Sequence, residues 1–188
     1  MKADINEECN VKIIARNKDT NDVVCERVGH NVWTSYGREY SCMLKSYDVN
    51  GQIIRDDRIF YAGVGSGAQP ETTSVASLVA PLPLSNNGNW LKSLDFGRTT
   101  FGSNQYKTSV RYVFVFDEND VIPNDNATSY ISECGLFTDG LQNVPYTRGQ
   151  RQNTIGTSLI QSPVAYHSFE PIPKNNNIQL EIIWELRH

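Results

Sequence analysis

The chain has 188 residues, a formal net charge of −4 at pH 7 and an aromatic content of 10%. This composition is not typical of a disordered chain, and the length fits one folded domain, or one domain with a small appendage. The acidic balance argues against non-specific binding to nucleic acid. No apolar run approaches the length of a membrane span, and the first residues lack the apolar segment of a signal peptide, so we expect a protein that folds in a cytoplasm.

The first predicted elements are a hairpin and a helix. Residues 11–16 and 23–28 are β-prone runs that flank a polar loop, which is typical of a hairpin. The period then changes, because aromatic and apolar side chains recur at helical spacing. These side chains are Tyr36, Tyr40, Met43, Leu44 and Tyr47. Their spacing predicts a helix over about residues 34–47, with Thr34 or Ser35 as its N-cap.

The middle of the chain predicts a strand, a short helix and a long loop. Residues 58–64 are β-prone, and a glycine-rich loop follows them. The next apolar residues keep helical spacing; they are Val75, Leu78, Val79 and Leu82. Two prolines end this pattern, which predicts a short helix near residues 72–80. Residues 85–105 are typical of a loop, with a strand near residues 90–96.

The second half of the chain predicts strands. Residues 112–116 are apolar on both faces, as in an interior strand, and residues 130–137 and 164–169 are also β-prone. Residues 178–187 alternate between apolar and polar side chains, and Ile183 alone breaks the alternation. A strand this regular ties the end of the chain into a sheet.

The strands are not regularly interleaved with helices, so a doubly wound parallel sheet is disfavoured. We predict a mainly β fold, an antiparallel β-sandwich of jelly-roll-like form with one medium helix near residues 34–47 and one short helix near residues 72–80. We expect a single domain over residues 1–188, from which the N-terminal hairpin at about residues 10–30 could protrude.

The four cysteines are Cys9, Cys25, Cys42 and Cys134. None lies in a CxxC pair, which argues against a zinc knuckle or a thioredoxin-like motif. In the predicted hairpin Cys25 would lie opposite Ile14 rather than Cys9, so a bridge between these two cysteines is disfavoured. We predict free, partly buried thiols, with a disulfide between subunits as the alternative.

Two patterns resemble sites for a nucleotide or a metal. Gly63, Gly65 and Ala68 match the dinucleotide pattern G-x-G-x-x-G/A, but residues 69–70 interrupt it and no further βα unit follows. We therefore predict a tight loop there. Residues 117–126 are rich in oxygen ligands and could hold Ca²⁺, although a solvated hairpin loop is the simpler interpretation.

Histidines and carboxylates give no catalytic pattern. His30, His167 and His188 do not lie at a metal-binding spacing, and no G-x-S-x-G motif exists. Glu133 is the acidic residue that stands out, because it lies on the strand face that we assign to Ile131 and Phe137. A buried carboxylate must be paired or accept backbone hydrogen bonds, and we expect the loop at residues 63–68 to supply the donors. We assign Glu133 a structural role.

Four stretches, in this order, resemble a group of small structural proteins encoded by tailed bacteriophages. The stretches are the hairpin ending at His30-Asn31 with the helix start at Tyr36-Gly37-Arg38-Glu39, the loop Ala62–Pro70 with Leu82-Pro83-Leu84, the strand Ile131–Phe137, and Phe169–Lys174 with the strand to Trp184. The resemblance spans most of the chain and implies a β-sandwich without enzymatic activity. It leaves open whether the part is a head decoration, a neck or collar, a tail or a fibre-attachment subunit. Cys134 lies where such proteins are expected to have a small residue such as alanine.

The leading hypothesis is a structural subunit of a tailed-phage virion, assembled in the host cytoplasm. We expect no catalytic, cofactor-binding or metal-binding residues and no cofactor. The expected partners are other virion proteins and copies of the chain itself, without nucleic acid or membrane. Aromatic and apolar side chains on the loops 85–105 and 140–156 are candidate anchors for these contacts; they are Trp90, Leu91, Phe101, Tyr106, Leu141 and Tyr146.

Two other functions stay open at this point. The chain could be a carbohydrate- or receptor-binding β-sandwich of a tail fibre, with Trp90 as a stacking platform for sugars. It could also be an enzyme such as a glycan hydrolase, because paired carboxylates cannot be recognised from sequence alone.

Overall fold

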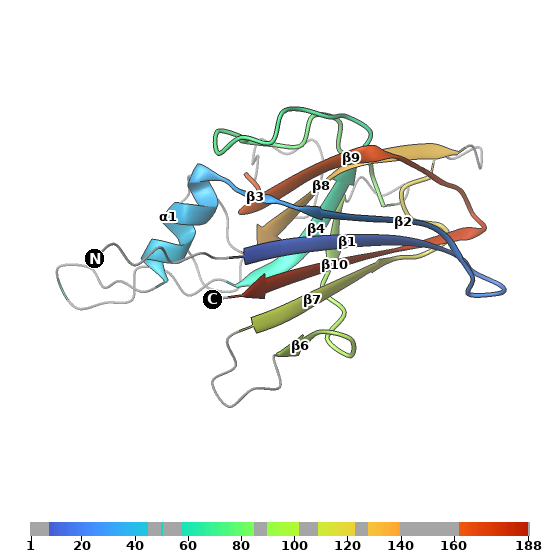
Figure 1. The fold of residues 1–188 in the computed structure, drawn as a ribbon, viewed down its shortest axis with the longest axis horizontal. Coiled ribbons are helices and arrows are strands. Elements are labelled where there is room, and N and C mark those ends of the chain that lie inside the picture. Colours follow the sequence, from blue (N-terminus) through green and yellow to red (C-terminus); the bar gives the residue numbers. More distant parts are fainter. Residues whose placement is uncertain are drawn as a thin grey trace.

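The computed structural model describes residues 8–44, 50, 58–84, 90–101, 109–122, 128–139 and 162–187. These residues form two antiparallel five-stranded sheets that pack face to face (Figure 1). The first sheet has the order β2 (Val23–His30), β1 (Glu8–Asn17), β10 (Ile178–Arg187), β7 (Ser109–Phe116), β6 (Thr100–Phe101). The second has the order β3 (Val32–Trp33), β9 (Ala165–Lys174), β8 (Ser129–Thr138), β4 (Ile59–Gly65), β5 (Leu91–Ser93). The predicted β-sandwich is confirmed.

Alternation along the strands builds the core between the sheets. In β10, Leu180, Ile182 and Trp184 are fully buried in the main hydrophobic cluster, together with Ile13 of β1 and Phe114 of β7. Successive side chains of a strand point to opposite faces, so the residues between them point away from the core. The strand β10 is central, because it pairs with β1 along one side and with β7 along the other.

The chain closes the sandwich at both lateral sides by crossing between the sheets. At Asn31, β2 of the first sheet leads directly into β3 of the second. On the other side, residues 94–95 cross back from β5. There the Leu94 N–H donates to the Phe60 carbonyl of the second sheet at 2.9 Å, and the Asp95 N–H donates to the Val113 carbonyl of the first sheet at 2.9 Å.

The helix α1 (Ser35–Met43) lies within the predicted range but is shorter than predicted. Thr34 is its N-cap, as predicted, since its hydroxyl accepts a hydrogen bond from the Gly37 N–H at 3.0 Å. The same hydroxyl donates to the Pro163 carbonyl at 2.6 Å, which fixes the helix start to the residues before β9. Tyr47, the last residue of the predicted stripe, lies outside the described residues. In the described part of the chain, no helix has the length and apolar character needed to cross a membrane.

The predicted helix near residues 72–80 is wrong. Val75 and Leu78 do face inward, and both are buried, but the segment consists of turns and bends. Its C-terminal end follows the end of β4, because the Ser66 N–H donates to the Ala80 carbonyl at 3.0 Å and the Leu82 N–H donates to the Val64 carbonyl at 2.9 Å. Backbone groups that pair with a strand cannot also form the bonds of a helix.

The hairpin β1–β2 is confirmed, with one error of register. Cys25 pairs with Ala15 and not with Ile14, because a bulge shifts the register between Ala15 and Arg16. The strand expected within residues 90–96 is β5. The strand β9 continues through Pro171 and Pro173, which are exposed on a stretch that has a single strand neighbour, β8.

Candidate interaction surface

The two outer faces of the sandwich differ in how they are covered. Residues 66–84 lie over the outer face of the second sheet (Figure 1, green stretch at the top). They bury Val75 and Leu78 against Tyr61, Phe137 and Tyr166, which form a second hydrophobic cluster. Among the described residues, no comparable segment covers the outer face of the first sheet.

Paired charges and aliphatic side chains share the outer face of the first sheet. Ile14, Val113 and Ile183 form a small cluster there, so the break in the alternation at Ile183 has a packing reason. Charged side chains lie around this cluster as ion pairs. The nearest pairs are Lys12 with Glu26 at 2.9 Å and Arg98 with Glu181 at 2.7 Å. Ile14, Val113 and Ile183 are at most 6% exposed, so the apolar centre of this face is buried, and the paired charges lie around it.

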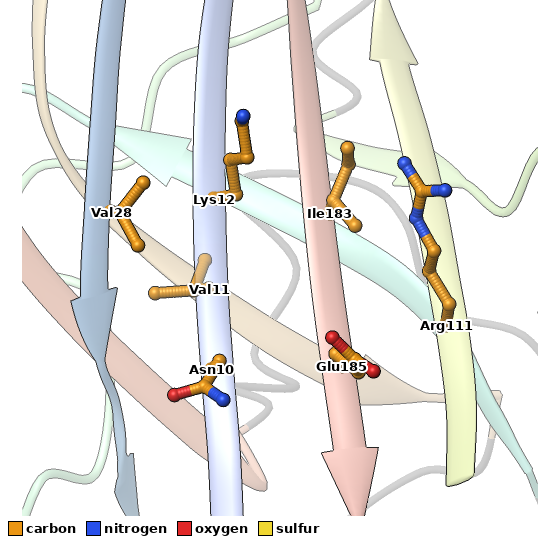
Figure 2. A pocket seen from close by; sticks show the side chains of 7 residues that line it. All are labelled: Asn10, Val11, Lys12, Val28, Arg111, Ile183 and Glu185. Carbon is orange, nitrogen blue, oxygen red and sulfur yellow. The ribbon is translucent and has the colours of Figure 1, made fainter.

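An open hollow of about 570 Å³ lies on this face. Its lining comes from four neighbouring strands, as Figure 2 shows; the residues are Asn10, Val11, Lys12, Val28, Arg111, Ile183 and Glu185. Lys12 and Arg111 stand on either side of Ile183, and Glu185 pairs with Arg187 at 2.9 Å. A broad, open depression of this kind suits a protein surface better than a small enclosed ligand.

The edge strand β2 adds exposed valines to this face. Val23, Val24 and Val28 are 49%, 56% and 67% exposed. Ordinary surface residues include single apolar side chains, but three exposed valines on one edge strand, with Glu26 between Val24 and Val28, are a local enrichment of apolar surface. We call Val23, Val24 and Val28 the β2 valine strip.

Glu133 is fully buried, as predicted, but its partners are different from those expected. Its Oε1 accepts a hydrogen bond from the Ala80 N–H at 2.8 Å, and its Oε2 accepts from the Val79 N–H at 3.0 Å and from the Tyr166 hydroxyl at 3.0 Å. The carboxylate thus holds the segment that covers the second sheet. Burial and the neighbouring Glu133 carboxylate raise the pKa of Tyr166 well above its ordinary value.

The glycine-rich loop is a packing site beside this carboxylate. A Cβ atom at Gly65 would lie 2.3 Å from Oε1 of Glu133, and one at Gly67 would lie 2.5 Å from Cβ of Val79. Glycine is needed because the loop, residues 79–80 and the carboxylate approach so closely. The prediction of a tight structural loop agrees with these contacts.

The expected face of Glu133 is partly wrong. A bulge shifts the pairing of β8 with β9 between Ile131 and Glu133. Ile131 therefore lies in the core between the sheets, whereas Phe137 lies in the second cluster under residues 66–84. Glu133 therefore lies on the same side of β8 as Phe137 but not on the same side as Ile131. Cys134 points into the main core, where burial raises the pKa of its thiol.

The histidines lie apart from any metal cluster. His167 Nδ1 is 2.7 Å from Oε1 of Glu71, and the imidazole stacks on Phe169 and lies against Gly29 of β2. Burial lowers the pKa of His167, and the Glu71 carboxylate opposes this shift without cancelling it. His30 is exposed, and His188 lies outside the described residues. Within the described ranges, no three His, Cys, Asp or Glu side chains are placed to hold a metal ion.

Lysines bind the first part of the oxygen-rich loop at residues 117–126, for which Ca²⁺ binding was the alternative interpretation. The ammonium of Lys92 lies 2.9 Å from Oδ2 of Asp117 and 2.6 Å from Oδ2 of Asp120, where a cation would bind. Lys174 is fully buried and donates to the Glu118 carbonyl at 3.0 Å. Burial lowers the pKa of Lys174 to about 8, and the nearby carboxylates only partly offset this effect. Residues 124–126 lie outside the described residues.

Trp90 and Leu91 are the predicted loop anchors whose side chains the structure describes, and both pack in the second hydrophobic cluster. Trp90 packs edge-on against Phe137, with ring centroids 5.1 Å apart, and lies over Gly63. Leu91 is buried in the same cluster. The anchors Tyr106, Leu141 and Tyr146 lie outside the described residues. For Phe101 the structure describes the backbone but not the side chain.

Cys25, Cys42 and Cys134 form no disulfide within the described part of the chain, and the side chain of Cys9 is not among the described ones. Cys25 is partly buried, as predicted, whereas Cys134 is fully buried and Cys42 is exposed. The surface that sequence reasoning missed is the outer face of the first sheet. Alternation along β10 and β1 indicated an outward face, but no local pattern indicated that the other described segments would leave it without a covering segment.

Comparisons of the chain with known protein families, sequences and structures identified no similar protein. No protein-family model matches the chain, and neither the curated proteins nor the solved structures contain a significant match.

Proposed function

We propose that this chain is a structural subunit of a tailed-phage virion, which assembles with neighbouring virion proteins and with copies of itself. The observation that carries the proposal is the asymmetry of the sandwich. One outer face is covered by residues 66–84, and the other presents the β2 valine strip and the hollow around Ile183. Exposed valines beside paired charges and an open hollow are typical of a protein–protein interface.

Three buried polar groups support this proposal because each of the three binds the backbone of a neighbouring segment. Glu133 binds the backbone of the covering segment, Lys174 binds the backbone of the loop after β7, and Thr34 binds the residues before β9. Such contacts make a rigid scaffold. The four stretches of the phage resemblance fall on this scaffold, at Thr34 and the helix start, at the glycine loop, at Glu133 and at Lys174.

The test is the composition of purified virions. Mass spectrometry of particles from the host that carries this gene should find the chain at a fixed number of copies per particle, and a density map should place it at one position. Absence from washed particles would contradict the proposal. A glycan array probed with the purified protein separates the alternative, since a carbohydrate-binding fibre module would give a signal that depends on Trp90.

A further inference from the structure

The four edge strands of the sandwich have unequal lengths. The edges β3, β5 and β6 have two, three and two residues, whereas the edge β2 has eight. Proteins commonly keep edge strands short, because unpaired N–H and C=O groups form a template for another strand. Among the described residues, the only strand that pairs with β2 is β1. Residues 167–174 of β9 also have a single strand neighbour among the described residues, but Pro171 and Pro173 lack N–H groups there. The strand β2 has no proline, so its long edge is the exception that needs an explanation.

We propose that a second copy of this chain occupies this edge, so that two β2 strands pair antiparallel about a two-fold axis at Val28. This inference rests on the proposed function, for which it names the self-association surface. An isologous contact requires a segment that complements itself, and an antiparallel strand pair about a two-fold axis meets this condition. The result is one continuous sheet of ten strands, built from the two five-stranded first sheets.

The register follows from the residues on the outer face. With Val28 on the axis, Val28 lies opposite its symmetry mate, and Glu26 lies opposite His30 of the second copy. The valine side chain is 67% exposed in the single chain, so the contact removes apolar surface from water. The pairing of Glu26 with an imidazole sets an acid against a base, which is favourable for cross-strand neighbours.

The bulge in the hairpin supports the same register. It lies between the pairs Ala15–Cys25 and Arg16–Val23, so the strand is regular from Cys25 to His30. The proposed pair uses residues 26–30 and stays within this regular part. A register centred on Glu26 would bring two carboxylates together, which is unfavourable.

The inner side of β2 leaves the edge accessible. Gly29 lies against the ring of His167, and Arg27 reaches Glu170 at 3.5 Å, so the strand is held from the core side by β9. These contacts hold β2 in position before a second copy arrives, which lowers the conformational cost of pairing.

Sedimentation equilibrium of the full chain tests the inference. The wild-type protein should dimerise, and Val28→Asp should weaken the dimer at least about tenfold, because it places two carboxylates on the axis. Phe96→Asp is the matched control, since Phe96 is 71% exposed in the loop that precedes the opposite edge strand, β6. Circular dichroism checks that both variants fold.

A cysteine pair tests the register. Directly opposite residues of antiparallel strands have Cα atoms about 4.5–5.5 Å apart, which is within the range for a disulfide. In a Cys25→Ser background, Val28→Cys should form a covalent dimer on mild oxidation. Glu26→Cys should not, since the two residues 26 would lie about 13 Å apart along the strands.

The outcomes separate this inference from the proposed function. A wild-type monomer at high micromolar concentration, or a dimer that Val28→Asp leaves intact, would overturn the β2 pairing even if virions contain the protein. A dimer that Glu26→Cys cross-links in place of Val28→Cys would overturn the register. Absence from virions would count against the proposed function alone.

Discussion

Replacing Glu133 by glutamine should destabilise the fold strongly, because three donors converge on its carboxylate. The variant keeps the size of the side chain and changes one acceptor oxygen to an NH₂ group. In its better orientation, the amide oxygen keeps the Val79 N–H and the Tyr166 hydroxyl, which both bind Oε2 in the wild type. The amide NH₂ then faces the Ala80 N–H, which binds Oε1 at 2.8 Å in the wild type.

The magnitude follows from these contacts. A buried donor left without an acceptor costs about 1–3 kcal/mol, and two hydrogen bonds that lose their charged acceptor cost about 1 kcal/mol more. We therefore expect Glu133→Gln to lower the free energy of unfolding by about 2–4 kcal/mol. Tyr166→Phe removes a single hydrogen bond to the carboxylate and should cost about 1–2 kcal/mol.

Urea unfolding at pH 7 measures these differences. Glu170→Gln is the matched control, because it changes the net charge equally while the Glu170 side chain is 86% exposed; it should shift stability by less than about 0.5 kcal/mol. Hydrogen exchange should accelerate at the amides of Val79 and Ala80 in Glu133→Gln. If Glu133→Gln and Glu170→Gln unfolded at the same urea concentration, the assigned role of the carboxylate would be refuted.

Three further predictions concern buried groups of the scaffold. Burial lowers the pKa of Lys174 to about 8; stability should therefore rise by up to about 3 kcal/mol between pH 8 and 10.5, and Lys174→Met should remove this rise in urea unfolding. Burial also lowers the pKa of His167 below 6.5, so the wild type should lose stability as the pH falls below 6.5, whereas His167→Phe should lose less over the same interval. Trp90→Ala should cost about 1–3 kcal/mol in thermal or urea unfolding, since Trp90 packs on Phe137; an unchanged stability would show that this packing is dispensable.

The parts of the fold that were predictable are those with a local signal. Residues 178–187 alternate, and the structure places Leu180, Ile182 and Trp184 in the core while Glu181 and Glu185 face outward. The capping role of Thr34 was equally local, because an N-cap needs only a hydroxyl before the first turn. The burial of Glu133 followed from its apolar neighbours in the same strand.

The predictions that failed depend on contacts from distant parts of the chain. The spacing of Val75 and Leu78 suits a helix, but it also suits a bent segment with two side chains turned to the sheet. Glu133 favours the bent segment, because its carboxylate binds two N–H groups that a helix would need for its own hydrogen bonds. Glu133 is 54 residues from Val79 in the sequence. A local period cannot reveal an acceptor so far away.

Bulges explain the errors of register. One extra residue in β2, Val24, moved the partner of Cys25 by one position. The shift after Ile131 placed that residue on the opposite side from Phe137. A bulge reverses the faces of all residues beyond it without leaving a clear pattern in sequence, so the assignment of faces fails even where the strand itself is predicted correctly.

The candidate interface was the least predictable feature, because it depends on the order of the strands. The alternation of Val24, Glu26 and Val28 is the same for a strand inside a sheet as for one at its edge. The position of β2 at an edge arises because β1 pairs with β10, from the far end of the chain, and so leaves β2 with one neighbour. The sequence predictions placed the contacts of the subunit on its loops. The topology favours the edge of the first sheet instead, since a strand whose backbone is already held by pairing loses little conformational entropy when it docks.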